Sequence, residues 1–329
     1  MTQEHPFAQY VRILGKGPNL SRALTLDETT DAARMVMRDE VEPVQLGAFL
    51  CLLRVKTETP EEIAGLALAA RETVATPGLA ADIDWAAYAG KSRQLPLFLL
   101  AALALAGSGV RVFMHGAEGH TAGRLYASAA LAALGVPACR SMAEAAERLE
   151  RHRFAYMTLE ALSPRLHQLM GLKALLGLRS PLHTVGRLLN PLAAPFSISA
   201  VTHPPYLAVH QQAAAILGQP RLATFKGEGG EVERRPEKPC EVLFLDDGRP
   251  GAEEWPALVE GARAKDEAME PARLAALWRG ETGDAVTEAT IAGTIAIALR
   301  HSGRAADIAA AEAAGRDLWR NRDRTRLPG

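Results

Sequence analysis

Apolar and polar positions in roughly the first 75 residues follow the spacing of amphipathic helices. Thr25 precedes one such stretch and is followed by Glu28, and Thr59 precedes another and is followed by Glu62. This Thr-x-x-Glu spacing is typical of a capping box, in which each side chain satisfies a free backbone N–H of the other residue. Between the two boxes, residues 43–56 form an almost continuously apolar helical stretch. The pattern predicts a small all-helical unit.

Beyond the turn predicted at residues 76–78, the pattern changes to short runs rich in β-branched and aromatic residues. Five runs are predicted as strands: 110–115, 154–158, 196–201, 221–226 and 241–245. Helices are predicted at 97–106, 122–134, 142–152, 206–217, 271–279, 287–300 and 305–320, and loops at 236–239 and 246–256. Strands that alternate with helices indicate a mostly parallel sheet covered on both faces. The predicted fold class is therefore α/β, with a small helical domain attached to a large domain around this sheet.

The composition is that of an ordinary globular chain, and bulk charge points to no partner. The 329 residues are 48% hydrophobic and 23% charged with a formal net charge of −1, so a nucleic acid would have to be held by a local patch. Cys51, Cys139 and Cys240 lack the spacing of a zinc site or a disulfide framework, which fits a reducing compartment. The start has no signal-peptide pattern, and the most apolar stretch, 95–110, is too short to span a bilayer. We expect a cytoplasmic protein without membrane contact.

Residues 88–100, YAGKSRQLPLFLL, contain Gly90-Lys91-Ser92, which looks like the end of a phosphate-binding loop. Such a loop requires G-x-x-x-x-G-K-[ST], because its glycines let backbone N–H groups close around the phosphates. The position of the first glycine is Trp85 here, so the motif is incomplete. Two cations, Lys91 and Arg93, nonetheless precede a helical run.

Three longer stretches carry a family resemblance: residues 41–71, 115–136 (HGAEGHTAGRLYASAALAALGV) and 176–192 (LGLRSPLHTVGRLLNPL). In order and spacing they are similar to segments of the anthranilate phosphoribosyltransferases of glycosyltransferase family 3. The resemblance implies the nucleoside phosphorylase/phosphoribosyltransferase type of fold. It implies a helical domain formed by residues 1–78 with about 163–188, and an α/β domain formed by 79–162 and 189–329. It also implies a homodimer that associates through the helical domain.

The residues that bind substrate in that family are largely replaced in this chain. The family's pyrophosphate loop, GTGGDG, corresponds to YAGKSRQLP, in which Gly90 is the one glycine kept. Val232 replaces the aspartate that binds Mg²⁺ beside Glu233, and Lys173 replaces the arginine associated with the anthranilate carboxylate, whose bidentate fork a lysine lacks. Glu118 stands where the family has an arginine. The other remnants of the loop and cleft are Ser92, His115, Gly116, Arg179 and Asn190. The resemblance thus implies a degenerate site, with no catalytic residue, metal or cofactor assigned and Glu233 as a metal-site remnant.

One branch of the family, the YbiB-type proteins, carries a similarly altered loop and binds nucleic acid without marked sequence preference. By this resemblance we expect the former pyrophosphate cleft to follow the phosphate backbone of single-stranded DNA or RNA. The cations predicted to line the cleft are Lys91, Arg93, Arg124, Lys173 and Arg187. Five arginines near the end of the chain, at 316, 320, 322, 324 and 326, outnumber Asp317 and Asp323 and are either solvated or an extension of the basic surface.

Two alternatives stay open. The first is an active phosphoribosyltransferase that uses phosphoribosyl pyrophosphate and Mg²⁺, with anthranilate or another acceptor, and Mg²⁺-dependent release of pyrophosphate would establish it. The second is a nucleoside phosphorylase, which shares the fold and would bind orthophosphate.

His115 and His120 flank a Gly-rich turn, and we expect them to be hydrogen-bonded turn residues rather than a catalytic acid or base.

Overall fold

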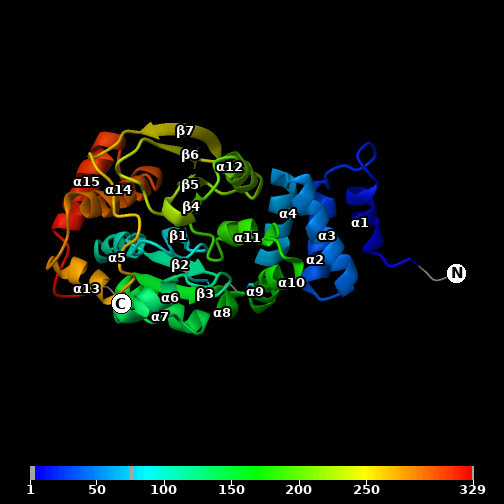
Figure 1. Cartoon of the computed structure of the whole chain (residues 1–329), viewed down its shortest axis with the longest axis horizontal. Helices are drawn as coiled ribbons and strands as arrows, with labels where there is room; N and C mark the ends of the chain where they lie inside the picture. The colour runs from blue at the N-terminus through cyan, green and yellow to red at the C-terminus, as the bar shows by residue number, and fades with distance from the viewer. Residues whose placement is uncertain (1–3, 75–77, 328–329) are drawn as a thin grey trace.

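A computed structural model describes residues 4–74 and 78–327 of the chain, so most of the turn predicted at 76–78 lies outside the described residues. Four helices begin the chain: α1 (Ala8–Gly15), α2 (Leu26–Met37), α3 (Pro43–Lys56) and α4 (Pro60–Arg71). Both predicted capping boxes are present, Thr25 with Glu28 at the start of α2 and Thr59 with Glu62 at the start of α4. These helices form one end of an elongated molecule (Figure 1).

The large domain is built around one seven-stranded sheet with the strand order β3-β2-β1-β4-β5-β6-β7. Its strands are β1 (Ile83–Ala86), β2 (Val112–Gly116), β3 (Phe154–Thr158), β4 (Phe196–Val201), β5 (Arg221–Lys226), β6 (Cys240–Asp246) and β7 (Arg249–Trp255). Strands β1 to β5 run parallel to one another, and β6 and β7 add an antiparallel hairpin at one edge. The α/β fold class with a mostly parallel sheet is therefore confirmed.

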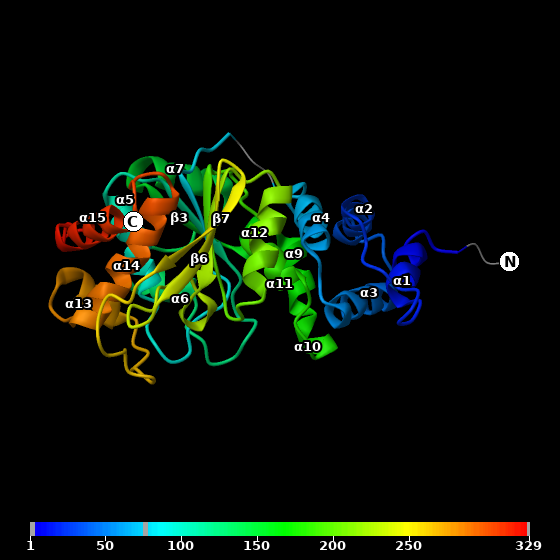
Figure 2. The ribbon, with the colours of Figure 1, turned by 90° about the horizontal axis from the view of Figure 1, so that it is seen from above.

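Helices cover both faces of this sheet (Figure 2). They are α5 (Phe98–Gly107), α6 (Ala127–Ala133), α7 (Met142–His152), α12 (Tyr206–Ile216), α13 (Ala272–Arg279), α14 (Ala285–His301) and α15 (Ile308–Arg320). Successive residues of one strand contribute to two different apolar clusters, because side chains alternate between the faces of a sheet. In β2, for example, Phe113 joins the cluster on the side of the helical domain, whereas Val112 and Met114 join the cluster that contains α5 and α14.

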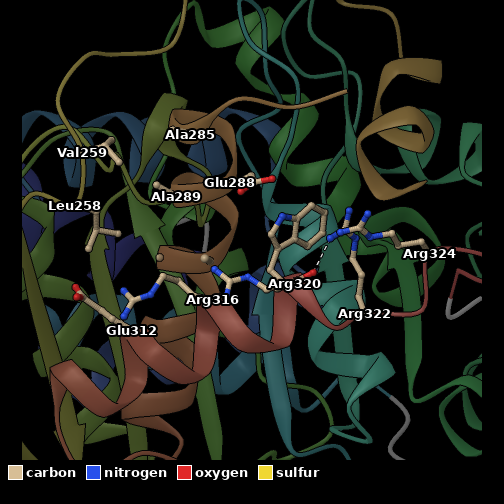
Figure 3. Close-up of a pocket in the computed structure, with 13 residues that line it drawn as sticks. Leu258, Val259, Ala285, Glu288, Ala289, Glu312, Arg316, Arg320, Arg322 and Arg324 are labelled. Atoms are coloured by element: carbon tan, nitrogen blue, oxygen red, sulfur yellow. Dashed lines mark hydrogen bonds between the residues drawn. The ribbon is translucent and has the colours of Figure 1, made fainter. Parts of the chain in front are cut away.

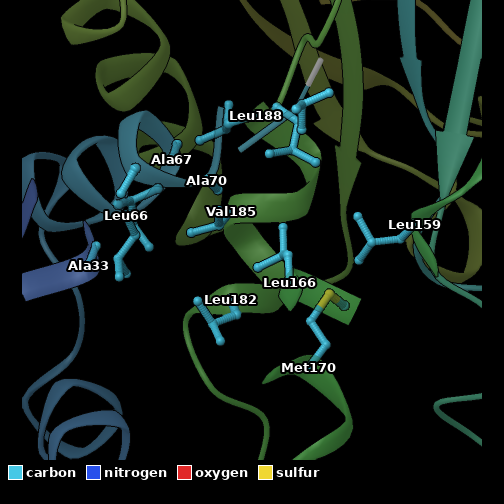
Figure 4. Packing of buried hydrophobic residues seen from close by; sticks show 14 of the residues in the cluster. Ala33, Leu66, Ala67, Ala70, Leu159, Leu166, Met170, Leu182, Val185 and Leu188 are labelled. Atoms are coloured by element: carbon cyan, nitrogen blue, oxygen red, sulfur yellow. The ribbon is translucent and has the colours of Figure 1, made fainter. Parts of the chain in front are cut away.

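A mid-chain segment returns to the helical domain. It contains α8 (Leu159–Leu162), α9 (Pro164–Gly171), α10 (Lys173–Leu176) and α11 (Leu182–Val185). Leu166 of α9 and Val185 of α11 are fully buried and share one apolar cluster with Leu66 and Ala70 of α4 (Figure 4). This packing joins residues about 100 positions apart and places α9–α11 between the sheet and the first four helices.

Two strands were not predicted, and both have a physical reason. β1 has four residues and carries Asp84 in its middle, but this carboxylate is buried against His115 at 3.0 Å. β7 was predicted as part of a loop because three of its seven residues are charged and four are exposed, as is common for edge strands. Asp247 and Gly248 join β6 to β7 with positive φ angles of 47° and 76°, the residue pair favoured in tight hairpin turns.

Within the described residues, no helix is long and apolar enough to cross a membrane.

Candidate functional site

The remnant phosphate loop crosses the carboxyl edge of the parallel strands, where ligands bind in open α/β sheets. It follows β1 and leads into α5, and Lys91 pairs with Leu125 as an isolated β-bridge. Gly90 has a φ of 68°, and a Cβ atom at this position would lie 2.8 Å from the Tyr126 ring. The one glycine kept from the family motif is therefore required by both the backbone conformation and the space available.

The backbone N–H groups of this loop are occupied by a side chain of the protein itself. Glu231 Oε1 accepts hydrogen bonds from Ala89 N at 2.7 Å and from Gly90 N at 2.5 Å. Glu231 is only 2% exposed, and burial raises the pKa of its carboxyl above the ordinary value. An internal carboxylate thus takes the place that a phosphate oxygen occupies in a functional loop of this kind.

A second carboxylate occupies the start of α5. Glu233 Oε2 accepts a hydrogen bond from Phe98 N, the first residue of α5, at 3.0 Å. Its other oxygen, Oε1, lies 2.8 Å from both Lys91 Nζ and Arg263 Nη1. Glu233 is fully buried and Lys91 is 3% exposed, so this ion pair is isolated from solvent. Lys91 therefore neutralises Glu233 and does not present its ammonium group to a ligand, contrary to the sequence-based expectation.

The residues present do not fit the magnesium ion that binds in this fold family. Mg²⁺ requires oxygen ligands that are free to coordinate it beside substrate phosphates. Glu231 Oε1 and both oxygens of Glu233 are committed to the contacts above, Glu231 Oε2 is the one carboxylate oxygen of the two without a hydrogen bond, and Val232 between them is fully buried and apolar. Among the described residues, no group of three or more metal-binding side chains comes together.

Arg124 and Arg187 lie in the cleft but direct their guanidinium groups to backbone carbonyls. Arg124 Nη1 donates to Ala89 O at 2.7 Å and to Gly90 O at 3.1 Å, which holds the outer side of the loop. Arg187 Nη1 donates to His183 O at 2.7 Å, and its guanidinium lies 5.7 Å from the centre of the Tyr88 ring. Burial lowers the pKa of Arg187. Neither arginine has a carboxylate partner within 4.0 Å among the described residues.

Lys173 and Arg179 provide the more accessible positive charge at the junction of the two domains. Lys173 Nζ donates to His120 O at 3.0 Å and lines a pocket between α9–α10 and residues 117–120. Arg179 is exposed, and no side-chain hydrogen bond of its guanidinium is present within residues 4–74 and 78–327. Burial, Arg179 and Arg124 together lower the pKa of Lys173, as expected where cations gather without carboxylates. Glu118 lines the same pocket, but its oxygens accept hydrogen bonds from Ser128 and Tyr156.

The two histidines of this junction are neutral at physiological pH. Burial lowers the pKa of His120 to about 4 and that of His183 to about 3. His120 Nε2 lies 2.9 Å from Tyr88 O, so the expectation of a hydrogen-bonded turn residue agrees with its contacts. The positive charge at the junction therefore comes from lysine and arginine alone.

Three other predicted site residues lie away from the ligand-accessible surface. His115 is fully buried between Asp84, at 3.0 Å from Nε2, and the Tyr88 hydroxyl, at 2.7 Å from Nδ1. Gly116 follows it and packs so closely on Ala87 O that a Cβ atom would lie 1.8 Å from that oxygen. Asn190 lies at the opposite edge of the sheet from Gly90. Its side chain bonds Ala194 and Gln219 just before β4 and β5 begin, so it fixes a turn and does not face the cleft.

The last two loop residues, Ser92 and Arg93, are exposed. Arg93 Nε lies 3.8 Å from Asp266, and both side chains are more than 70% exposed. Arg263 and the role of Glu231 were not predicted from the sequence. Arg263 comes from a loop of irregular structure, far from any motif. The sequence signal that points to Glu231 is its position two residues before Glu233, with the apolar Val232 between them.

Comparisons with known proteins agree with this geometry at the level of the fold. Residues 8–74 match the family model described as the helical bundle domain of the glycosyl transferase family. The anthranilate phosphoribosyltransferase of Methylobacterium radiotolerans is 32% identical over 230 residues, which cover 69% of this chain and 66% of the relative. That of Desulfitobacterium hafniense is 29% identical over 239 residues, covering 72% and 69%. The chain thus spans about two thirds of the length of these relatives.

Two further similarities bear on the choice between functions. "Uncharacterized protein YbiB" of Escherichia coli is 25% identical over 246 residues, covering 73% of this chain and 76% of that protein. The structure of anthranilate phosphoribosyltransferase from Thermus thermophilus superposes with a TM-score of 0.81 at 23% identity, covering 96% of this chain and 94% of the other. The yeast enzyme in complex with PRPP and Mg has a TM-score of 0.76 at 16% identity, covering 97% and 94%. The chain is an anthranilate phosphoribosyltransferase-like protein of glycosyltransferase family 3.

Proposed function

We propose that this protein binds single-stranded DNA or RNA without marked sequence preference and does not transfer phosphoribosyl groups. The observation that carries the proposal is the occupation of the loop by Glu231, which accepts both N–H groups that a pyrophosphate would need. A pyrophosphate could enter only by displacing this carboxylate from two buried hydrogen bonds. It would also approach Glu233, and like charges in one buried volume repel each other strongly.

The cations at the domain junction support binding to a phosphate backbone. Lys173 and Arg179 have no carboxylate within 4.0 Å among the described residues, and Arg124 and Arg187 add charge behind them. Arg93 extends the basic surface toward the loop, although Asp266 partly offsets its charge. A phosphate that replaces solvent around such cations releases counterions from the strand, which favours binding at low salt.

The aromatic residues of the cleft argue against binding through base stacking. Tyr88 and Phe98 are each 1% exposed, and Tyr126 is 8% exposed, so none offers a free ring face. Binding would therefore rest on phosphate contacts, which position a strand but do not read its sequence. Weak sequence preference and strong salt dependence both follow from this.

The test is to compare a Lys173→Ala/Arg179→Ala double variant with wild type by fluorescence anisotropy, using labelled oligonucleotides of different sequence at several salt concentrations. Loss of two phosphate contacts should reduce the slope of log K against log salt by about 1.4, and to the same extent for every sequence. A matched control is Arg140→Ala/Arg151→Ala, which removes two exposed arginines from the region of α7. An unchanged slope in the Lys173→Ala/Arg179→Ala variant would mean that the binding site does not lie at the domain junction.

An active phosphoribosyltransferase is the alternative, favoured by the 29–32% identity with the anthranilate phosphoribosyltransferases of two bacteria. It requires Glu231 and Lys91 to leave their partners when substrate binds. Release of pyrophosphate from phosphoribosyl pyrophosphate, dependent on both Mg²⁺ and an acceptor, would establish this alternative and overturn the proposal.

We also propose that the helical domain forms a homodimer through α3. Apolar residues lie on two opposite faces of this helix, and Gln45, Arg54 and Lys56 are its polar residues. Leu46, Phe49, Leu50 and Leu53 are used inside the domain, but Val44 and Val55 on the opposite face are 80% and 81% exposed. They are eleven residues apart and therefore lie on one side of the helix. A Val44→Asp/Val55→Asp variant should halve the solution mass, and a monomeric wild type at micromolar concentration would contradict the proposal.

A further inference from the structure

Four arginines near the end of the chain line one pocket, and none of the cations at the domain junction contributes to its lining. Arg316 and Arg320 belong to α15, and Arg322 and Arg324 follow it (Figure 3). The pocket measures about 370 Å³ and lies between α14, α15 and the loop that carries Leu258. In Figures 1 and 2, α15 lies at the end of the molecule opposite the helical domain, so this pocket is separate from the cleft.

The pocket exists because four small residues lie on the face of α14 that lines it, beside Glu288. They are Ala285, Ala289, Ala292 and Gly293, spaced at three to four positions so that they share one side of the helix. Leu258, Val259 and Trp319 complete an apolar lining. At Gly293 a Cβ atom would lie 2.9 Å from Arg234 Cδ and 3.0 Å from Leu258 Cδ1, so the backbone forms part of the wall itself.

The arginines around this apolar hollow lack acidic partners. Arg316, Arg320 and Arg324 are exposed, and they form no ion pair within 4.0 Å and no side-chain hydrogen bond with any residue of 4–74 or 78–327. The pocket contains two carboxylates, and Glu312 already pairs with Arg234 at 3.1 Å. Only Glu288, which is exposed, remains to offset their charge.

The fourth arginine builds the wall of the pocket. Arg322 donates to Trp278 O at 2.9 Å and to Leu277 O at 2.8 Å, and its guanidinium lies 3.4 Å from the centre of the Trp319 ring. Burial, and to a lesser extent Arg324, lowers the pKa of Arg322 to about 10, so it stays charged at neutral pH. These contacts fix the chain beyond α15 and hold the other arginines around the hollow.

We infer that this pocket binds a nucleotide unit, that is, a phosphate group attached to a base that enters the apolar hollow. Guanidinium groups bind phosphate oxygens through paired N–H donors, and three unpaired guanidinium groups on one rim suit a phosphate with two negative charges. The apolar lining suits the flat, largely apolar faces of a base. The unit can come from a free mononucleotide or from the phosphorylated end of a strand, and the chemistry of recognition is the same.

The experiment is calorimetric titration of the full-length protein with adenosine 5′-monophosphate, adenosine and inorganic phosphate. We expect the nucleotide to bind most tightly, and Arg316→Ala/Arg320→Ala to weaken it at least tenfold. Both side chains are exposed and make no hydrogen bond with described residues, so the variant should keep its fold. The matched control is Arg326→Ala, which removes an arginine of the same tail that does not line the pocket.

Three results would overturn the inference: no nucleotide binding to wild type, phosphate alone binding as tightly as the nucleotide, or equal affinity in the Arg316→Ala/Arg320→Ala variant. Loss of nucleotide binding in Lys173→Ala/Arg179→Ala instead would assign the nucleotide to the cleft and likewise overturn it. An oligonucleotide with and without a 5′-phosphate separates the two sources. If the 5′-phosphate adds affinity only when Arg316 and Arg320 are present, the source is a strand end, and otherwise it is a free mononucleotide.

Discussion

Lys91 and Arg179 carry the same charge, and the sequence predicts both to lie at the remnant loop and cleft, but their surroundings are opposite. Lys91 is buried against Glu233, whereas Arg179 is exposed and has no carboxylate within 4.0 Å in the part of the chain that the structure describes. The former phosphate loop is thus neutralised from within, and the junction of the two domains is not. The difference teaches that a cation in a phosphate-binding motif indicates an anion site only when no internal carboxylate already occupies it.

The largest expected effect comes from breaking the internal pair. Lys91→Ala leaves Glu233 fully buried with Arg263 as its remaining cation, and this should lower the free energy of unfolding by about 3 kcal/mol, as measured by urea titration. Arg93→Ala is the matched control two residues away, where an exposed and long ion pair should contribute no more than about 0.5 kcal/mol. Equal effects of the two substitutions would mean that Lys91 is as solvated as Arg93.

A smaller effect concerns the pH dependence that Glu231 imposes. The pKa of its carboxyl is raised in the folded protein, so above pH 4.5 the folded chain holds a proton that the unfolded chain has lost. The free energy of unfolding should therefore fall as the pH rises through this window, by at most about 1.4 kcal/mol per pH unit for one proton. In Glu231→Gln this part of the pH dependence should be absent. Identical profiles for the two proteins, measured by urea titrations at several pH values, would mean that the carboxyl is not held in the loop.

The smallest effect is expected at the domain junction, where histidine should contribute no charge. His120 and His183 have pKa values lowered to about 4 and about 3, so neither gains a proton between about pH 6 and 8. Oligonucleotide affinity at fixed salt should therefore be constant over this range. Protonation would add positive charge and strengthen binding as the pH falls. A several-fold gain in affinity at the lower pH, measured by anisotropy, would show that an imidazole takes part.

The sequence was most informative where a residue's neighbours in the chain decide its structure. The capping boxes at Thr25 and Thr59 and the parallel strands from β2 to β5 could be predicted because local spacing determines both. β7 could not, because the pairing of an exposed, charged edge strand depends on its neighbour in the sheet and not on its own apolar pattern.

The candidate site was less predictable, because its decisive contacts join distant residues. Lys91 and Glu233 are 142 positions apart, and nothing in either local pattern shows that their side chains meet. The sequence suggested a ligand-facing lysine at position 91 and the remnant of a metal site at Glu233, and the two side chains instead neutralise each other. Equally, Arg179 forms no ion pair within residues 4–74 and 78–327 because the described elements around it bring no carboxylate within 4.0 Å, which its own sequence neighbours do not reveal.

The most direct test of the central claim is calorimetric titration of the wild-type protein with phosphoribosyl pyrophosphate in the presence of Mg²⁺. Because Glu231 already accepts the N–H groups of the loop and Lys91 already pairs with Glu233, we predict no saturable binding up to about 1 mM, the upper end of ordinary substrate affinities. Single-stranded oligonucleotide in the same buffer at low salt should bind and serves as the positive control. Stoichiometric binding of phosphoribosyl pyrophosphate at micromolar concentration, dependent on Mg²⁺, would contradict the account.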